Sequence, residues 1–138
     1  MRTDDVHVFI SCFRREDEAL AYSQAQWEPE PGEDASDEDY KAWEDSNPSW
    51  LMRKELGEPY LDSDFIEIVW GTGDGEPGVR WDYLASVIGS ANTSVCQRLA
   101  PSEATTLILI FGQALGGFPF AFSSTPEMTY CGAFPWLS

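Results

Sequence analysis

Three carboxylates, Asp62, Asp64 and Glu67, have the type and spacing from which a metal-dependent hydrolase could be built. Hard divalent cations need several oxygen ligands that converge on one point. In an extended chain Asp62 and Asp64 point to one side and Glu67 to the other, and the spacing does not resemble a calcium loop. We therefore favour carboxylates that are solvated or bonded to backbone amides, and the hydrolase is the alternative. Glu67 lies between apolar residues, which predicts that it faces an enclosed or contact surface.

The stretch GTGDGEPG, residues 71–78, has the position of a phosphate-binding loop, between a predicted strand and a predicted helix. Its spacing does not fit, because the GxGxxG pattern needs a third glycine where Glu76 stands. No lysine follows, and the carboxylates of Asp74 and Glu76 would repel phosphate. The sequence predicts a simple turn.

Nucleophilic catalysis finds few candidates in this chain. The single histidine, His7, lies inside a predicted strand, and Cys12, Cys96 and Cys131 are far apart with no CxxC pattern. We interpret the cysteines as buried, reduced thiols that pack as small apolar side chains. The chain also lacks GxSxG and HExxH motifs. These observations predict a binding protein rather than an enzyme, with no cofactor and no bound metal.

The charge of the chain is unusually negative and unevenly placed. The formal net charge is −16, and 21 of the 24 acidic residues lie in residues 1–76. Such a field repels nucleic acid and anionic membranes and attracts basic proteins. We therefore expect a basic protein partner and exclude nucleic acid and membrane surfaces as partners.

The segment EPEPGEDASDEDYKAWED, residues 28–45, concentrates nine carboxylates around one lysine and includes two aromatic residues. Aromatic anchors ringed by carboxylates suit an interface with a basic protein, and a solubilising loop is the alternative. With Asp64 and Glu67, the predicted binding residues are Asp34, Asp37, Glu38, Asp39, Tyr40, Trp43, Glu44 and Asp45.

Four segments have the composition of β-strands: 6–13, 63–71, 104–112 and 128–134. The third, ATTLILIFG, is continuously apolar and is expected to be central in the sheet. The last, MTYCGAF, is expected at an edge. Helical patterns alternate with these strands, which predicts an α/β (α+β) fold with a small mixed or antiparallel sheet of about four strands covered by helices.

Helices are predicted at 14–27, from Ser36 onward, at 48–57 and at 79–90, with a further helical turn in 91–99. Ser36 is the expected N-cap of the second helix, and Asp39 stands where a capping box has its acidic residue. Residues 28–37 carry two prolines and a glycine and are expected to form a loop. We expect one domain, residues 1–138, with an acidic insertion at about 28–45.

The chain contains no run of about 18 apolar residues, so a transmembrane helix is not expected. Its first residues, MRTDDVHVFI, carry acids where a secretion signal needs positive charge, and they lack a long apolar stretch and a cleavage site. We therefore expect a cytoplasmic protein.

The order of motifs resembles that of a known protein family. A strand VHVFISCF leads into a helix with EDEALAYS, and SWLMRKELGEPYLDSDFIEIVWG follows, with Asp62, Asp64, Phe65 and Glu67 at the entrance to the next strand. This pattern, over roughly residues 6–71, resembles the immunity protein 22 family of bacterial polymorphic-toxin systems.

The resemblance implies a cytoplasmic antidote that binds and blocks a cognate toxin made by the same or a sibling cell. A toxin that attacks nucleic acid must present a basic active-site surface, which an acidic protein can occupy in place of phosphate. We therefore expect a nuclease as the partner. Besides the hydrolase, a regulatory module that binds another basic protein is the remaining alternative.

Overall fold

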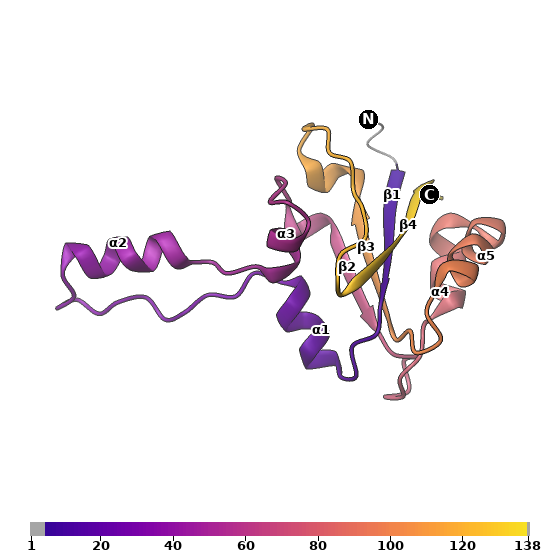
Figure 1. The fold of residues 1–138 in the computed structure, drawn as a ribbon, viewed down its shortest axis with the longest axis horizontal. Helices are drawn as coiled ribbons and strands as arrows, with labels where there is room; N and C mark the ends of the chain where they lie inside the picture. The colour runs from indigo at the N-terminus through magenta and orange to yellow at the C-terminus, as the bar shows by residue number, and fades with distance from the viewer. Residues whose placement is uncertain (1–4, 138) are drawn as a thin grey trace.

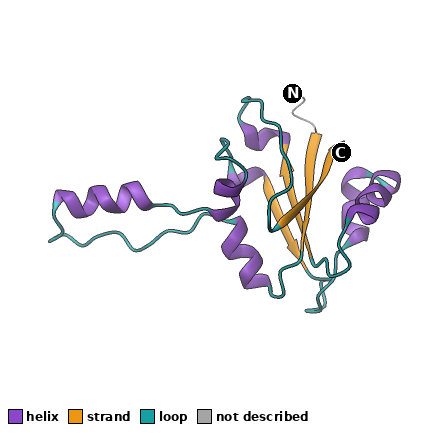
Figure 2. Cartoon of the chain, viewed as in Figure 1, coloured by secondary structure: helices purple, strands orange, loops and turns teal. Residues whose placement is uncertain are grey.

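The computed structural model describes residues 5–137, which fold into one antiparallel sheet with helices on both faces (Figures 1 and 2). The strands lie in the order β2-β3-β1-β4, and neighbouring strands are antiparallel. This arrangement confirms the predicted fold class. The strands are β1 Asp5–Ser11, β2 Ile66–Trp70, β3 Thr106–Phe111 and β4 Met128–Pro135.

β3 lies inside the sheet because its six residues, TLILIF, are apolar enough to be buried on both faces. Its residue Leu109 pairs with Val8 of β1 on one side and with Glu67 of β2 on the other. β4 forms an edge and pairs with β1 through a register shift between Val8 and Phe9. The predicted central position of 104–112 and edge position of 128–134 are both confirmed.

Short helices connect the strands, and within residues 5–137 none is long and apolar enough to cross a lipid bilayer. Two 3-10 turns, η1 and η2, precede β2 and follow β3. The bounds are α1 Glu16–Ser23, α2 Asp37–Ser46, α3 Leu51–Glu55, η1 Ser63–Phe65, α4 Trp81–Ile88, α5 Ser90–Leu99 and η2 Gly112–Leu115.

The sheet separates two apolar cores. Val8 and Leu109 face α4 and α5, whereas Phe9 and Ile108 face α1 and α3. Burying one such side chain contributes about 1.5–3 kcal/mol relative to leaving it exposed. The two packed faces therefore make the sheet a stable platform for the segments that project from it.

Four predicted elements differ from those observed. The first helix ends at Ser23 instead of residue 27, because Gln26 pairs in a short antiparallel bridge with Ser49. The same bridge delays the start of α3 to Leu51. The predicted strand at 63–71 begins with a 3-10 turn, and residues 91–99 form a full helix rather than one turn.

The acid-rich segment leaves the body of the protein. We call residues 27–47 the acidic arm: an extended limb runs outward, and α2 returns along it (Figure 1). Ser36 begins α2 as predicted, since its side chain accepts from the Asp39 amide and the Asp39 carboxylate accepts from the Ser36 amide. The chain reverses through the turn before it, where the Ala35 amide donates to the Gly32 carbonyl at 2.9 Å, and the capping box then begins α2 at the outer end of the arm.

Candidate functional site

The base of the acidic arm is closed by backbone hydrogen bonds. Gln26 and Ser49 exchange two N–H···O bonds of 2.7 and 2.9 Å. Next to them, the Glu28 amide donates to Asn47 Oδ1 at 2.7 Å. Both ends of the arm are therefore held together where they leave the body.

Two aromatic side chains of α2 tie the helix to the extended limb. Tyr40 Oη donates to the carbonyl of Pro31 at 2.9 Å, and Trp43 Nε1 donates to the carbonyl of Glu28 at 3.0 Å. The rings of Trp43 and Trp27 also pack at 5.9 Å between centroids. Tyr40 and Trp43, which we predicted as anchors for a partner, are partly buried and hold the two limbs of the arm in register.

The aromatic residue that the arm exposes most is Trp27, at 62%. Trp27 precedes the acidic segment in the sequence and is not among the predicted binding residues. Its position depends on the end of α1 at Ser23, because residues 24–27 leave the helix there and lead into the base of the arm.

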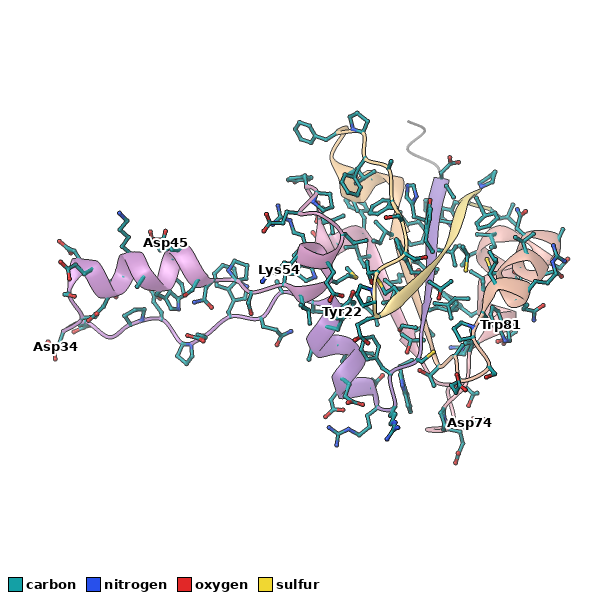
Figure 3. The ribbon with its side chains drawn as sticks, in the orientation of Figure 1. Tyr22, Asp34, Asp45, Lys54, Asp74 and Trp81 are labelled. Atoms are coloured by element: carbon teal, nitrogen blue, oxygen red, sulfur yellow. The ribbon has the colours of Figure 1, made fainter. Side chains whose placement is uncertain are left out.

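The carboxylates of the arm have no ion-pair partner within residues 5–137. Among residues 5–137, the ion pairs join Arg15 to Asp17 at 3.2 Å and to Glu18 at 4.0 Å, and none involves the arm. Every residue of α2 is at least partly exposed, and Figure 3 shows Asp34 at the outer end and Asp45 nearer the body. The arm therefore presents its negative charge directly to solvent.

The placement of acids along α2 works partly against the helix. Asp37, Glu38 and Asp39 lie in the first turn, where they complement the positive end of the helix dipole. Glu44 and Asp45 lie near the opposite end, where the last turn carries no basic residue. A carboxylate there is unfavourable by about 0.3–1 kcal/mol at low salt. Cations brought by a partner would remove this local cost.

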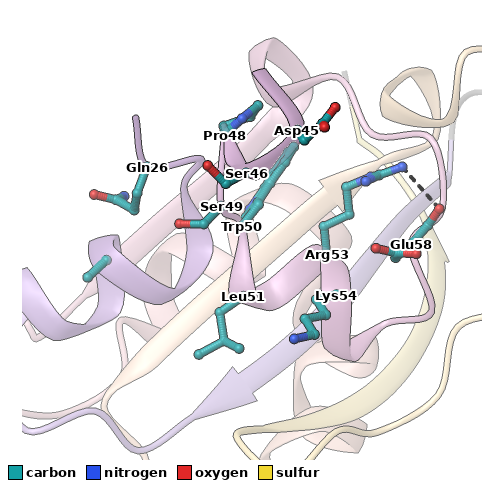
Figure 4. A pocket seen from close by; sticks show the side chains of 11 residues that line it. Gln26, Asp45, Ser46, Pro48, Ser49, Trp50, Leu51, Arg53, Lys54 and Glu58 are labelled. Carbon is teal, nitrogen blue, oxygen red and sulfur yellow. Dashed lines mark hydrogen bonds between the residues drawn. The ribbon is translucent and has the colours of Figure 1, made fainter. Parts of the chain in front are cut away.

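A hollow of about 500 Å³ lies where the arm meets α3 (Figure 4). Arg53 is held within it by hydrogen bonds from Nε to the Pro59 carbonyl at 2.7 Å and from its terminal nitrogen to the Glu58 carbonyl at 3.1 Å. Lys54 also lines the hollow, opposite in charge to Asp45 of the arm. This hollow lies at the junction of the arm and the body and contains both acidic and basic side chains. The predominantly acidic surface lies further from the body, along the arm.

The carboxylates of Asp62, Asp64 and Glu67 are not arranged as they would be in an extended chain. Asp62 is used as the cap of η1, since its Oδ1 accepts from the Asp64 amide at 3.0 Å. The turn that follows brings Asp64 and Glu67 to the wall of one hollow. The expectation that these two side chains point to opposite sides is wrong, because residues 63–65 are turned and not extended.

Glu67 is partly buried on the face of the sheet that α4 covers. Tyr83 of α4 donates its hydroxyl to the carboxylate, with distances of 2.8 Å to Oε1 and 2.6 Å to Oε2. Burial, reinforced by this carboxylate, raises the pKa of Tyr83 to about 12. Tyr83 therefore stays protonated near neutral pH and remains a hydrogen-bond donor to Glu67. Glu67, which we predicted to face an enclosed or contact surface, is partly buried beside Tyr83 and lines an open hollow.

The remaining candidates for chemistry are dispersed. Within residues 5–137, no three His, Cys, Asp or Glu side chains gather closely enough to hold a metal ion. His7 lies in β1, with Nδ1 at 2.9 Å from Tyr130 Oη, and burial lowers the pKa of His7. Residues 71–78 form the predicted turn, in which the Thr72 amide donates to the Glu76 carbonyl at 3.0 Å.

The cysteines agree only in part with the prediction that they are buried. Cys96 and Cys131 are buried free thiols of the α4–α5 core, whereas Cys12 is exposed at the end of β1. A hydrogen bond with the Cys96 thiol, together with burial, raises the pKa of Cys131. The prediction of burial is wrong for Cys12 because β1 ends at Ser11 and the chain there turns toward solvent.

Comparisons with known proteins identified no counterpart: no family model, no curated protein and no solved structure matched the chain. The resemblance to the immunity protein 22 family therefore stays a prediction.

Proposed function

We propose that this protein is an immunity protein that acts in the cytoplasm, where it binds and neutralises a toxin with a basic active-site surface. A nuclease is the toxin class that fits best, because its substrate is a polyanion. The acidic arm occupies the basic surface in place of the phosphate groups of the nucleic acid.

One observation carries this proposal: the carboxylates of the arm stand on a projecting element and have no ion-pair partner among residues 5–137. A loop that only keeps a protein soluble needs no defined shape. This arm has a base closed by backbone hydrogen bonds, two side-chain hydrogen bonds between its limbs and a capping box at its outer end. Such order lowers the conformational entropy that is lost on binding.

The arm would act at two ranges of distance. Far from contact, its negative field steers a basic partner and raises the association rate. In contact, Asp34, Asp37, Glu38 and Asp45 meet cationic side chains, and the exposed ring of Trp27 adds apolar area at the base of the arm. Tyr40 and Trp43 support this surface by keeping α2 against the extended limb.

The experiment neutralises four arm acids that are outside the capping box: Asp37→Asn, Glu38→Gln, Glu44→Gln and Asp45→Asn. The matched control removes the same charge from exposed body positions: Asp74→Asn, Glu76→Gln, Glu103→Gln and Glu127→Gln. Both proteins are titrated against the toxin domain encoded beside this gene, with toxin activity and the dissociation constant as readouts.

We expect the arm variant to bind about 100-fold more weakly or worse and to lose protection, and the control to stay within about threefold of wild type. Equal binding by the two variants would reduce the arm to a solvated loop and overturn the proposal. If the neighbouring gene encodes a basic protein without toxic activity that binds through the arm, a regulatory module replaces the immunity protein.

A further inference from the structure

A second hollow lies on the body, away from the arm, at the end of the sheet near the chain's C-terminal segment. Its volume is about 360 Å³, within the range of small-ligand sites. Its lining comes from three stretches of the chain: η1 with β2, β3 with η2, and the residues after β4. We call it the aromatic pocket, and it is lined by Asp64, Phe65, Glu67, Phe111, Gln113 and Trp136.

Three of the lining side chains are aromatic. Phe111 is buried, and the ring of Trp136 meets it edge to face at 5.1 Å between centroids. Phe65 and Trp136 are 41% and 43% exposed, so both rings are accessible to a ligand. Aromatic rings carry negative charge on their faces, so a site walled by them favours a cation over a neutral or anionic ligand.

Two carboxylates, those of Asp64 and Glu67, also line the pocket. Within residues 5–137, no lysine, arginine or histidine forms an ion pair with Asp64 or Glu67. Glu67 accepts one hydroxyl hydrogen, from Tyr83, whereas a carboxylate has about four acceptor sites. The pocket therefore keeps unused acceptor capacity beside a partly buried negative charge, and a cation that supplies N–H donors would satisfy both.

Gln113 adds a third acceptor to the same wall. Its Oε1 is buried and has no hydrogen-bond partner among the described residues. The pocket combines carboxylates with aromatic rings, and this combination matches the planar guanidinium group, which stacks on rings and donates hydrogen bonds in its own plane.

We propose that the aromatic pocket binds the guanidinium group of an arginine side chain of the protein partner. The proposal depends on the proposed function for the existence of a basic partner, and the pocket itself can be tested without that partner. The arm attracts the partner over long distances, and the pocket holds one side chain of it in a fixed position.

The test titrates N-acetyl-arginine methylamide into the full chain and follows the indole signal of Trp136 by NMR. The neutral, equally shaped N-acetyl-citrulline methylamide is the ligand control. We expect saturable arginine-amide binding with a dissociation constant on the order of 1 mM, and binding of the citrulline amide at least about tenfold weaker.

Two variants locate the site. Glu67→Gln removes the charge but keeps an acceptor for Tyr83, and it should weaken binding of the arginine amide about five- to tenfold. Asp74→Asn makes the same charge change in the exposed glycine loop and should have no effect. Trp136→Leu keeps an apolar wall and removes one ring, and it should weaken binding severalfold; binding of the ligand to this variant is followed by the amide signals of β2.

Equal binding of the arginine and citrulline amides, or equal affinity of the Glu67→Gln and Asp74→Asn variants, would overturn the pocket proposal. The two proposals fail separately. If the arm variant loses the toxin while the chain ignores the arginine amide, the pocket is wrong and the proposed function stands. If the arginine amide binds while the arm variant keeps the toxin, the proposed docking mode of the arm is wrong.

Discussion

The acidic arm and the aromatic pocket present negative charge in opposite ways. The arm spreads nine carboxylates over a slender element that is open to water on most sides, whereas the pocket has two carboxylates among three aromatic rings. Water and salt screen the first arrangement within about 8 Å at physiological ionic strength, and screen the partly buried Glu67 less. We propose that the arm raises the rate of encounter with a partner, whereas the pocket prolongs the contact.

The largest expected effect concerns salt and the association rate. Raising the ionic strength from 0.01 to 0.15 M shortens the Debye length from about 30 to 8 Å. The association rate of wild type with the toxin should therefore fall by about 10- to 100-fold, and that of the four-acid arm variant by much less. Stopped-flow measurements of the association rate check this. An equal dependence of that rate on ionic strength in the two proteins would contradict the role of the arm.

The second prediction separates dissociation from association. Trp136→Leu removes a ring of the pocket and should raise the dissociation rate of the toxin complex about tenfold, with an unchanged association rate. Surface plasmon resonance measures both rates. Phe118→Leu, which changes an aromatic side chain that is 62% exposed outside both regions, is the control and should leave both rates unchanged. A slower association rate for Trp136→Leu would contradict the assignment of association to the arm and of dissociation to the pocket.

The third prediction concerns the order of the arm itself. Ser36→Ala removes the cap of α2 and should destabilise that helix by about 1 kcal/mol. This loss corresponds to a rise of about fivefold in the hydrogen-exchange rate of the helix amides. Exchange in the pocket strands β2 and β3 should not change, because the arm contributes no residue to either core. The control is Ser94→Ala, an exposed serine of α5. Unaltered exchange in α2 would mean that the capping box does not hold the arm.

The smallest expected effect is a pH dependence in the pocket. The pKa of Tyr83 is raised to about 12, so the protonated form is favoured in the folded protein. Stability from this group is complete below pH 10 and is lost as the pH rises from 10 toward 12. Tyr83→Phe should therefore lose less stability than wild type over that range. Urea unfolding at several pH values measures the difference, and parallel curves would contradict the Tyr83–Glu67 bond.

Much of the fold was predictable from local patterns. The apolar run of β3 predicted a central strand, and Ser36 with Asp39 predicted the start of α2, since both signals lie within a few residues. The end of α1 at Ser23 was not predictable, because it depends on the bridge between Gln26 and Ser49, which are 23 positions apart.

The candidate site was predictable in composition but less so in geometry. The acids of the arm were evident from the sequence, whereas the hydrogen bonds that occupy Tyr40 and Trp43 arise only when the chain reverses at the end of the arm. That Glu67 and Trp136 line one pocket was not predictable, since it requires β2, β3 and the segment after β4 to assemble at one end of the sheet.

Hydrogen exchange in the complex with the proposed toxin would show most directly whether the acidic arm contacts the partner. Amides of α2 and of the extended limb should become protected in the complex, together with those around the aromatic pocket. Protection confined to α5 and its surroundings, with exchange in the arm as fast as in the free protein, would contradict the account.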